Sequence, residues 1–204
     1  MHRTYLTAIP LQGRYDLEQV AYAREGRTAP QATRFPILQV IRDTLAPGDT
    51  AQVLAIRQEN ADTTRNYRFL LEELAGLGIP ESSVTQITLP ENQQPGTLVQ
   101  LCRAVADALP QTARVYACIT YGTKSIPVVT LAALTCAEAT HTELEVGGIY
   151  YGEIRRQDGH TVSARLNDVT VLYQLSGLVG GIRDSETAEK VFRQLIWMSE
   201  HREG

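Results

Sequence analysis

Strand-like and helix-like segments alternate along most of this chain, and this alternation limits the possible folds more than any other feature. Short apolar runs are typical of buried strands, and apolar residues three or four positions apart are typical of helices that cover a sheet. The strand-like segments are 4–9, 51–56, 83–89, 115–120 and 146–154, and the helical segments between them are 34–45, 62–77, 97–109 and 125–139. They predict an α/β fold, in which a mostly parallel sheet carries helices on both faces and the crossovers are right-handed.

The C-terminal part of the sequence has a different pattern. Residues 157–160 read Gln-Asp-Gly-His, and an Asp-Gly pair between two strand-like segments predicts a β-hairpin. Segments 169–178 and 186–201 have helical patterns. Because no internal repeat or linker is visible, we expect one domain over residues 1–155, with a C-terminal hairpin and helical appendage (156–204) that packs on the same domain.

Charge and hydropathy narrow the choice of partners. The chain has 204 residues, 43% of them hydrophobic, and a formal net charge of -4, so it has no overall attraction to a long polyanion. We therefore expect no long nucleic acid as partner, and a local site for any anionic ligand. No apolar run is long enough to span a bilayer, and the N-terminal residues lack the pattern of a signal peptide. The expectation is a cytoplasmic protein with no membrane partner.

The sequence predicts neither a metal site nor a cofactor. Four histidines, at positions 2, 141, 160 and 201, lie in predicted termini or loops without further ligands at metal-binding spacing. His-Thr-Glu at 141–143 resembles part of the zinc deaminase motif, but the Pro-Cys-x-x-Cys element is absent. Cysteines 102, 118 and 136 form no Cys-x-x-Cys pair, so we expect reduced core residues. The glycine pair at 147–148 indicates a β-bulge or a close helix approach.

Two loops have the composition of a ligand site. Ligands of an open parallel sheet bind beyond the carboxyl ends of its strands, where the strand order reverses. The first loop, residues 10–14, is Pro-Leu-Gln-Gly-Arg and follows the first strand. Its glycine permits a close backbone approach, and Gln12 and Arg14 can donate hydrogen bonds. The second loop, residues 121–127, is Tyr-Gly-Thr-Lys-Ser-Ile-Pro and follows the fourth strand.

The second loop has the composition of an anion site at a helix N-terminus. Thr123 or Ser125 can cap the helix, and Pro127 is tolerated in the first turn, where amide groups lack helical partners. Lys124 adds a positive charge, and the chain has only one other lysine, Lys190, beside 17 arginines. A solvated surface lysine is the alternative interpretation of Lys124. The spacing differs from a Walker A motif, so we expect no nucleotide hydrolysis of that type.

The stretch ITYGTKSIPVVTLAALTCAE (119–138), followed by VGGIYYGEI (146–154), resembles the signature region of CARF (CRISPR-associated Rossmann fold) domains of type III CRISPR accessory proteins. That region has a strand, a Thr-x-Gly-type turn with Lys or Arg, a proline, an apolar helix and a strand with a Tyr-Gly pair. Together with RFPILQVIRDTLAPGD, AQVLAI and NADTTRNYRFLLEEL, the resemblance covers most of residues 4–155. An acidic residue often precedes the turn in the family. Cys118 or Ile119 stands there in this chain, so contacts of that acid are not carried over.

The resemblance implies a Rossmann-like domain and a homodimer whose paired loops clasp a cyclic tetra- or hexa-adenylate. An even-numbered ring can have a two-fold axis, so an isologous dimer can offer each half the same donors. The resemblance implies that Lys124 and the backbone amides of residues 122–125 contact phosphate groups of the ring. It also implies that Gln12 and Arg14 hydrogen-bond to phosphate, ribose or base. Tyr121 and Tyr151 would stack on adenines, although packing roles are the alternative. The implied ligand-binding residues are Pro10, Leu11, Gln12, Gly13, Arg14, Tyr121, Gly122, Thr123, Lys124, Ser125, Pro127, Tyr151 and Gly152.

Three functions are compared on this basis. The first is a sensor domain that regulates a type III CRISPR antiviral response through an effector domain or protein outside this sequence. The second is a metal-independent ring nuclease, in which a ribose 2'-hydroxyl attacks the adjacent phosphate and Lys124 and Arg14 stabilise the developing charge. The third, a transcription regulator, is disfavoured because no basic recognition helix follows residue 155. We expect Phe192, Leu195, Ile196 and Trp197 to extend the dimer contact.

Overall fold

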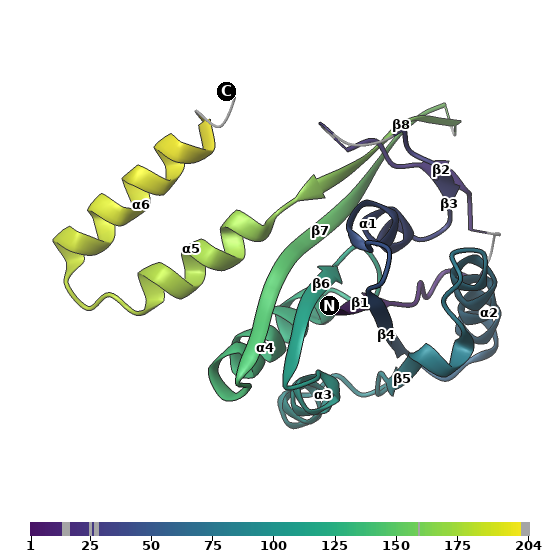
Figure 1. Ribbon diagram of the computed structural model, residues 1–204, viewed down its shortest axis with the longest axis horizontal. Helices are drawn as coiled ribbons and strands as arrows, with labels where there is room; N and C mark the ends of the chain where they lie inside the picture. The colour runs from purple at the N-terminus through teal and green to yellow at the C-terminus, as the bar shows by residue number, and fades with distance from the viewer. Residues whose placement is uncertain (14–16, 25, 27–28, 159, 201–204) are drawn as a thin grey trace.

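The computed structural model describes residues 1–13, 17–24, 26, 29–158 and 160–200 (Figure 1). Its main sheet has six strands in the order β5-β4-β1-β6-β7-β8. The strands are β1 (His2–Ala8), β4 (Thr50–Arg57), β5 (Val84–Thr88), β6 (Thr112–Cys118), β7 (Glu143–Gln157) and β8 (His160–Asp168). All neighbours pair in parallel except β7 and β8. The predicted α/β fold is therefore confirmed, and its strand order is that of a Rossmann fold.

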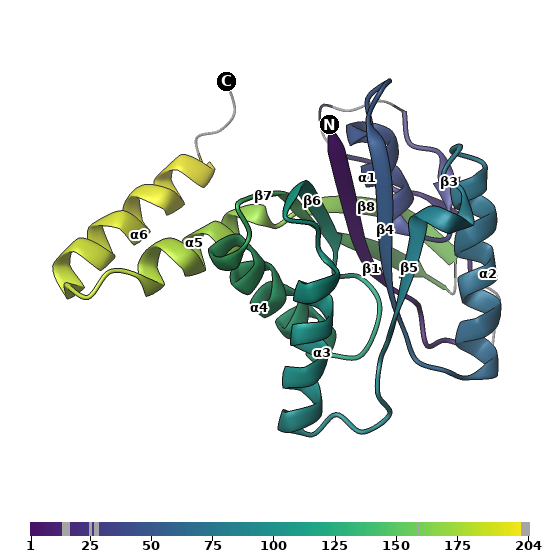
Figure 2. The ribbon, with the colours of Figure 1, turned by 60° about the horizontal axis from the view of Figure 1, so that its bottom comes forward.

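Helices cover both faces of this sheet (Figures 1 and 2). One face packs on α1 (Pro36–Thr44) and α2 (Ala61–Ala75), and the other packs on α3 (Pro95–Ala108) and α4 (Ser125–Thr140). Successive strand residues point to opposite faces, so Tyr5 of β1 belongs to the first core cluster and Leu6 to the second. The ring of Tyr5 stacks on that of Tyr116, its register partner on β6, with 5.5 Å between centroids.

The start of α2 is set by a capping box, and the helix begins one residue before the start that the apolar pattern indicates. The Asn60 side chain accepts a hydrogen bond from the amide of Thr63 at 2.9 Å, and the amide of Asn60 donates to the hydroxyl of Thr63. Thr63 is thus the third residue of the helix, and Asn60 is its N-cap. The helix ends at Ala75 with Gly76 as its C-cap, two residues before the predicted end, and the short helix η1 (Glu81–Ser83) follows before β5.

The predicted hairpin is confirmed, and its strands are longer than the sequence pattern indicates. Strands β7 and β8 pair antiparallel from Tyr150–Asp168 to Gln157–His160, and Asp158 in the turn has φ 51°. The β6–β7 register shifts as it passes Gly147, so the glycine pair marks a bulge, as expected. Strands β2 (Val20–Ala21) and β3 (Ala32–Thr33) were not predicted from the sequence, and they form a two-stranded ribbon beside β8.

The C-terminal helices extend away from the sheet (Figures 1 and 2). Helix α5 (Thr170–Gly180) begins at the end of β8 and buries none of its residues, and α6 (Ser185–Glu200) packs on α5. Strand β8 completes the main sheet, so the boundary expected at residue 155 falls inside the hairpin. Among the described residues, no helix combines the length and the apolar character needed to cross a membrane.

Candidate functional site

The two loops predicted to bind a ligand lie at the same edge of the sheet. The strand order reverses between β1 and β6, and the loops follow the carboxyl ends of these two strands. Gly122 packs against the last residue of β1, because a Cβ built on Gly122 would be 3.2 Å from the Cβ of Ala8. The structure thus places both loops at the switch-point edge of the sheet, with Gly122 of the second loop against the end of β1.

The backbone at Gly122 requires glycine. Its φ is +101°, a conformation that residues with a side chain rarely adopt. A Cβ there would also approach Cγ1 of Ile126 to 2.9 Å. The amide of Ile126 donates to the carbonyl of Thr123 at 3.0 Å, which closes the turn into α4. This glycine therefore allows the chain to pass from β6 into α4 while it contacts the end of β1.

The first turn of α4 has no side-chain cap. The N-cap residue is Lys124, so the prediction that Thr123 or Ser125 would cap the helix is wrong. Those two hydroxyls lie 2.8 Å apart, and Ser125 also donates to Oε1 of Gln93, which precedes α3. Their hydrogen bonds thus hold the loop instead of the helix end. The exposed ammonium group of Lys124 adds positive charge where the helix dipole is already positive, an arrangement that favours an anion.

A buried asparagine, Asn66 of α2, holds the first loop. Its Nδ2 donates to the carbonyls of Pro10 and Gln12, both at 2.9 Å. No peptide bond within the described ranges is cis. Since a trans peptide points its N–H opposite to its C=O, the amides of Leu11 and Gly13 point away from Asn66. The loop also lies close to the start of α2, because a Cβ on Gly13 would be 1.9 Å from Oδ2 of Asp62.

Asn66 and Gln93 belong to this site but were not among the residues predicted from the sequence. A signal for Asn66 was present, since the buried residues of α2 are Thr63, Asn66, Leu70 and Leu74. A polar residue on such a buried stripe needs a hydrogen-bond partner, and here the partner is the loop. Gln93 had no comparable signal, because its contact with Ser125 depends on how α3 packs beside α4.

The predicted site residues differ in how accessible they are. Pro10 is buried, while Gln12, Gly122 and Lys124 are exposed. Leu11, Gly13, Thr123, Ser125 and Pro127 are partly buried. Arg14 lies outside the described residues. The accessible polar groups of the two loops are therefore Gln12, Lys124 and the surrounding backbone.

Tyr121 is oriented toward the core. Its hydroxyl donates to the carbonyl of Arg34 at 2.7 Å, and its ring packs edge-on against Phe35 with 6.3 Å between centroids. Burial raises the pKa of Tyr121 well above its usual range. These contacts correspond to the packing role considered above as the alternative to adenine stacking. Tyr121 anchors the start of the second loop to the residues that precede α1.

The Tyr151–Gly152 pair lies beside the second loop, and its two residues face different surroundings. The side chain of Tyr151 is 42% exposed, so its ring is accessible. Gly152 is buried, and a Cβ there would approach Cγ of Pro36 to 2.6 Å. Its amide donates to the hydroxyl of Thr120 at 2.7 Å. Gly152 thus packs on α1, and only Tyr151 presents a side chain at this edge.

The described part of the chain contains no cluster of three or more histidine, cysteine or carboxylate side chains that could hold a metal ion. His160 is exposed and His2 and His141 are partly buried, while His201 lies outside the described residues. All three cysteines are free thiols. Only Cys118 is fully buried, whereas Cys102 is partly buried and Cys136 is exposed, so the expectation of three core cysteines is wrong for Cys136.

No protein-family model and no curated protein matches this chain. The fold and the site therefore define its class: an α/β protein with Rossmann strand order and a loop after each of the two strands at the switch point of its sheet.

Proposed function

We propose that this chain is a sensor domain that binds a cyclic oligoadenylate as a homodimer and regulates a type III CRISPR antiviral response in the cytoplasm. The observation that carries the proposal is the contact between Gly122 and Ala8. This contact lies at the end of β1, from which the first loop continues, and the uncapped N-terminus of α4 with Lys124 begins two residues after Gly122. These two loops are the segments that the resemblance to CARF domains assigns to the ligand.

The chemistry of such a ring suits the two loops. Each phosphodiester carries one negative charge, which the ammonium of Lys124 and the positive end of α4 stabilise. Gln12 is exposed on the first loop and can bond to ribose or base. The accessible ring of Tyr151 offers a stacking surface for adenine. A contact of Arg14 with the ring is part of the proposal on sequence grounds alone.

The dimer follows from the symmetry of the ligand. A tetra- or hexa-adenylate ring can have a two-fold axis, so two identical protomers can each bind half of it through the same residues. Binding then changes the relation between the protomers, and an effector domain or protein outside this sequence responds to that change. With a net charge of -4, the chain suits a small anion at a local site better than a long nucleic acid.

The direct test is incubation with radiolabelled cyclic tetra- and hexa-adenylate in the presence of EDTA. Bound ligand is measured by filter retention, and intact and cut rings are separated by chromatography. The proposal expects saturable binding of one ring, recovered intact, and much weaker binding of the linear oligoadenylate of the same length. Recovery of cut products would instead identify the metal-independent ring nuclease, and a lack of binding to either ring would contradict the proposal.

A further inference from the structure

Two cysteines on neighbouring helices lie close together. Cys102 is in the middle of α3 and is partly buried, and Cys136 is in the second half of α4 and is exposed. Helices α3 and α4 pack side by side on one face of the sheet (Figure 2). The side chains of Cys102 and Cys136 interact with each other. Two free thiols therefore meet where these helices pack.

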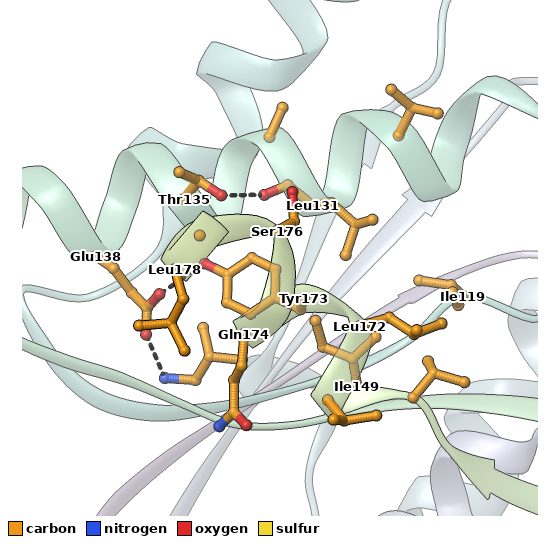
Figure 3. A pocket seen from close by; sticks show the side chains of 16 residues that line it. Ile119, Leu131, Thr135, Glu138, Ile149, Leu172, Tyr173, Gln174, Ser176 and Leu178 are labelled. Carbon is orange, nitrogen blue, oxygen red and sulfur yellow. Dashed lines mark hydrogen bonds between the residues drawn. The ribbon is translucent and has the colours of Figure 1, made fainter. Parts of the chain in front are cut away.

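The residue spacing in α4 directs Cys136 toward α3. Ser125, in the first turn of α4, donates to Gln93, which lies two residues before α3. Cys136 follows Ser125 by 11 residues, close to three turns of an α-helix, so both lie on the same side of α4. The other side of α4 faces α5 across a groove lined by Leu131 and Thr135 (Figure 3). Cys136 thus points to α3 and away from this groove.

Small residues beside the two cysteines let the helices approach closely. Ala106 lies one turn after Cys102 and is partly buried, and Ala133 lies about one turn before Cys136 and is fully buried. Packed helices lie about 8–10 Å apart, and the distance is shortest where the side chains at the contact are small. A disulfide needs its Cα atoms about 4.4–6.8 Å apart. The two Cys side chains can therefore reach across the interface with little movement of the backbone.

The three cysteines of the chain differ in their access to an oxidant. Cys136 is exposed, so a small oxidant reaches its sulfur directly. Burial and the neighbouring Cys136 side chain raise the pKa of Cys102, so this thiol is less reactive on its own. Cys118 is fully buried and belongs to the core cluster on the opposite face of the sheet. It is therefore separated from the pair.

We propose that Cys102 and Cys136 are a redox modification site, at which hydrogen peroxide converts the two thiols to a disulfide that joins α3 to α4. The Cys136 sulfur attacks the peroxide O–O bond and becomes a sulfenic acid, with release of one water. The Cys102 sulfur then attacks the Cys136 sulfur and displaces its oxygen as a second water. Two thiols and one peroxide thus give one disulfide and two waters. A small dithiol reverses the reaction by thiol–disulfide exchange.

The site suits the cytoplasmic location proposed above. Thiols are kept reduced in that compartment, and the disulfides that form there are mostly transient and redox-sensing. The hydrogen bond between Ser125 and Gln93 already ties α4 to the segment before α3 beside the second ligand loop. The disulfide adds a second tie between the helices three turns farther along α4. This inference goes beyond the proposed function and does not depend on binding of a cyclic oligoadenylate.

The disulfide is expected within one chain. Its two cysteines interact in a single copy, and helix α6, which was expected to extend the dimer contact, lies away from α3 (Figures 1 and 2). Of the residues named for that contact, Phe192, Ile196 and Trp197 are exposed, and the side chain of Leu195 lies outside the described part of the chain. Oxidation should therefore not link two chains covalently.

The test is treatment of the reduced full chain with hydrogen peroxide, followed by alkylation with N-ethylmaleimide in denaturant and by mass spectrometry. Trypsin separates the three cysteines, because Cys102, Cys118 and Cys136 lie on the peptides 69–103, 115–124 and 125–155. The expected product is a cross-link between peptides 69–103 and 125–155. Cys118 is the internal control and should be recovered alkylated, since its thiol is buried in the folded chain.

Two variants test the order of the steps. After peroxide treatment, Cys136→Ser should retain an alkylated Cys102, whereas Cys102→Ser should carry a sulfenic acid at Cys136 that dimedone traps. Circular dichroism should show a native fold for both, because neither altered side chain is fully buried. Oxidation should raise the thermal midpoint of the parent by about 10 °C and leave that of both variants unchanged.

Three alkylated thiols in the oxidised parent, a cross-link that includes Cys118, or covalently joined chains in place of the internal cross-link would each overturn the site. An oxidised parent that unfolds at the same temperature as the reduced chain would overturn the claim that the disulfide fits the native packing of α3 on α4.

Discussion

The hydroxyl of Tyr121 donates a 2.7 Å hydrogen bond to the backbone carbonyl of Arg34, which links the start of the second ligand loop to the segment before α1. The carboxylate of Glu73 on α2 accepts hydrogen bonds from the hydroxyl of Thr33 and from the amide of Arg34, so it fixes the same segment. The second loop is therefore tied through this segment to α1 and α2 on one face of the sheet. Helix α4, which begins at the end of the loop, lies on the other face.

Tyr121→Phe should destabilise the protein by about 1–3 kcal/mol, because it leaves the partly buried carbonyl of Arg34 without the Tyr121 donor. Urea unfolding followed by circular dichroism measures this loss. Tyr151→Phe is the matched control, since that side chain is 42% exposed and the change should stay within about 0.5 kcal/mol. Equal stability of the two variants would show that the Tyr121 hydrogen bond does not contribute.

Asn66→Ala should release the first loop, because the carbonyls of Pro10 and Gln12 lose their shared donor. The expected cost is about 1–3 kcal/mol. Hydrogen exchange should become faster in residues 10–13 than elsewhere. Asn167→Ala removes a partly exposed asparagine that donates to Glu153 at 3.3 Å on the surface, and it should leave exchange in the loop unchanged. Unchanged loop protection in the Asn66 variant would contradict the role given to this residue.

Gly122→Ala should destabilise the chain by about 1–3 kcal/mol, because the backbone at φ +101° is strained for alanine and the new methyl group contacts Ile126. Thermal unfolding measures the effect. The control is Gly96→Ala near the start of α3, where a Cβ meets nothing within 4 Å. There alanine should be neutral or stabilise by about 0.4–1 kcal/mol. A Gly122 variant as stable as the control would mean that the turn tolerates a side chain.

Asp49 makes stability dependent on acid pH. Its Oδ1 accepts a hydrogen bond from the N-terminal ammonium at 2.9 Å, and its other oxygen pairs with Arg3, so the pKa of Asp49 lies well below its usual range. The folded state favours the carboxylate. Its contribution to stability is complete above the unfolded pKa of about 3.9 and is lost as the pH falls toward the lowered folded value. Urea unfolding between pH 6 and pH 2.5 should therefore show a smaller loss for Asp49→Asn than for the parent, and parallel losses would contradict this account.

The sequence predicted the repeating core of the fold but not the elements that depend on tertiary contacts. The five parallel strands and the helices between them carry strong apolar periodicity. Their order along the chain was therefore predictable. Strands β2 and β3 have two residues each and no periodicity. They are held by contacts beside them, such as the hydrogen bond from the amide of Ala23 to the carbonyl of Ala164 at 3.0 Å.

The position of the candidate site in the sheet was predictable from the sequence, but the orientation of several of its side chains was not. Parallel strands place their carboxyl ends at one edge, so the two loops could be assigned to that edge from sequence. The orientation of Tyr121 could not, because its partner Arg34 is 87 residues away in the chain. Likewise, Gly152 belongs to a Tyr-Gly motif but faces Pro36, a contact that only the packing of α1 determines.

Isothermal titration calorimetry of Lys124→Ala beside Lys190→Ala tests the central claim most directly. Lys190 pairs with Glu186 on the exposed face of α6, so its loss should leave affinity for cyclic oligoadenylate nearly unchanged. Loss of Lys124 removes a charge-assisted contact worth about 1.5–3 kcal/mol and should weaken binding by about tenfold to a hundredfold, or more if both copies in a dimer contribute. Equal affinities of the two variants would contradict the assignment of the loop, and no binding by the parent chain would contradict the proposed function itself.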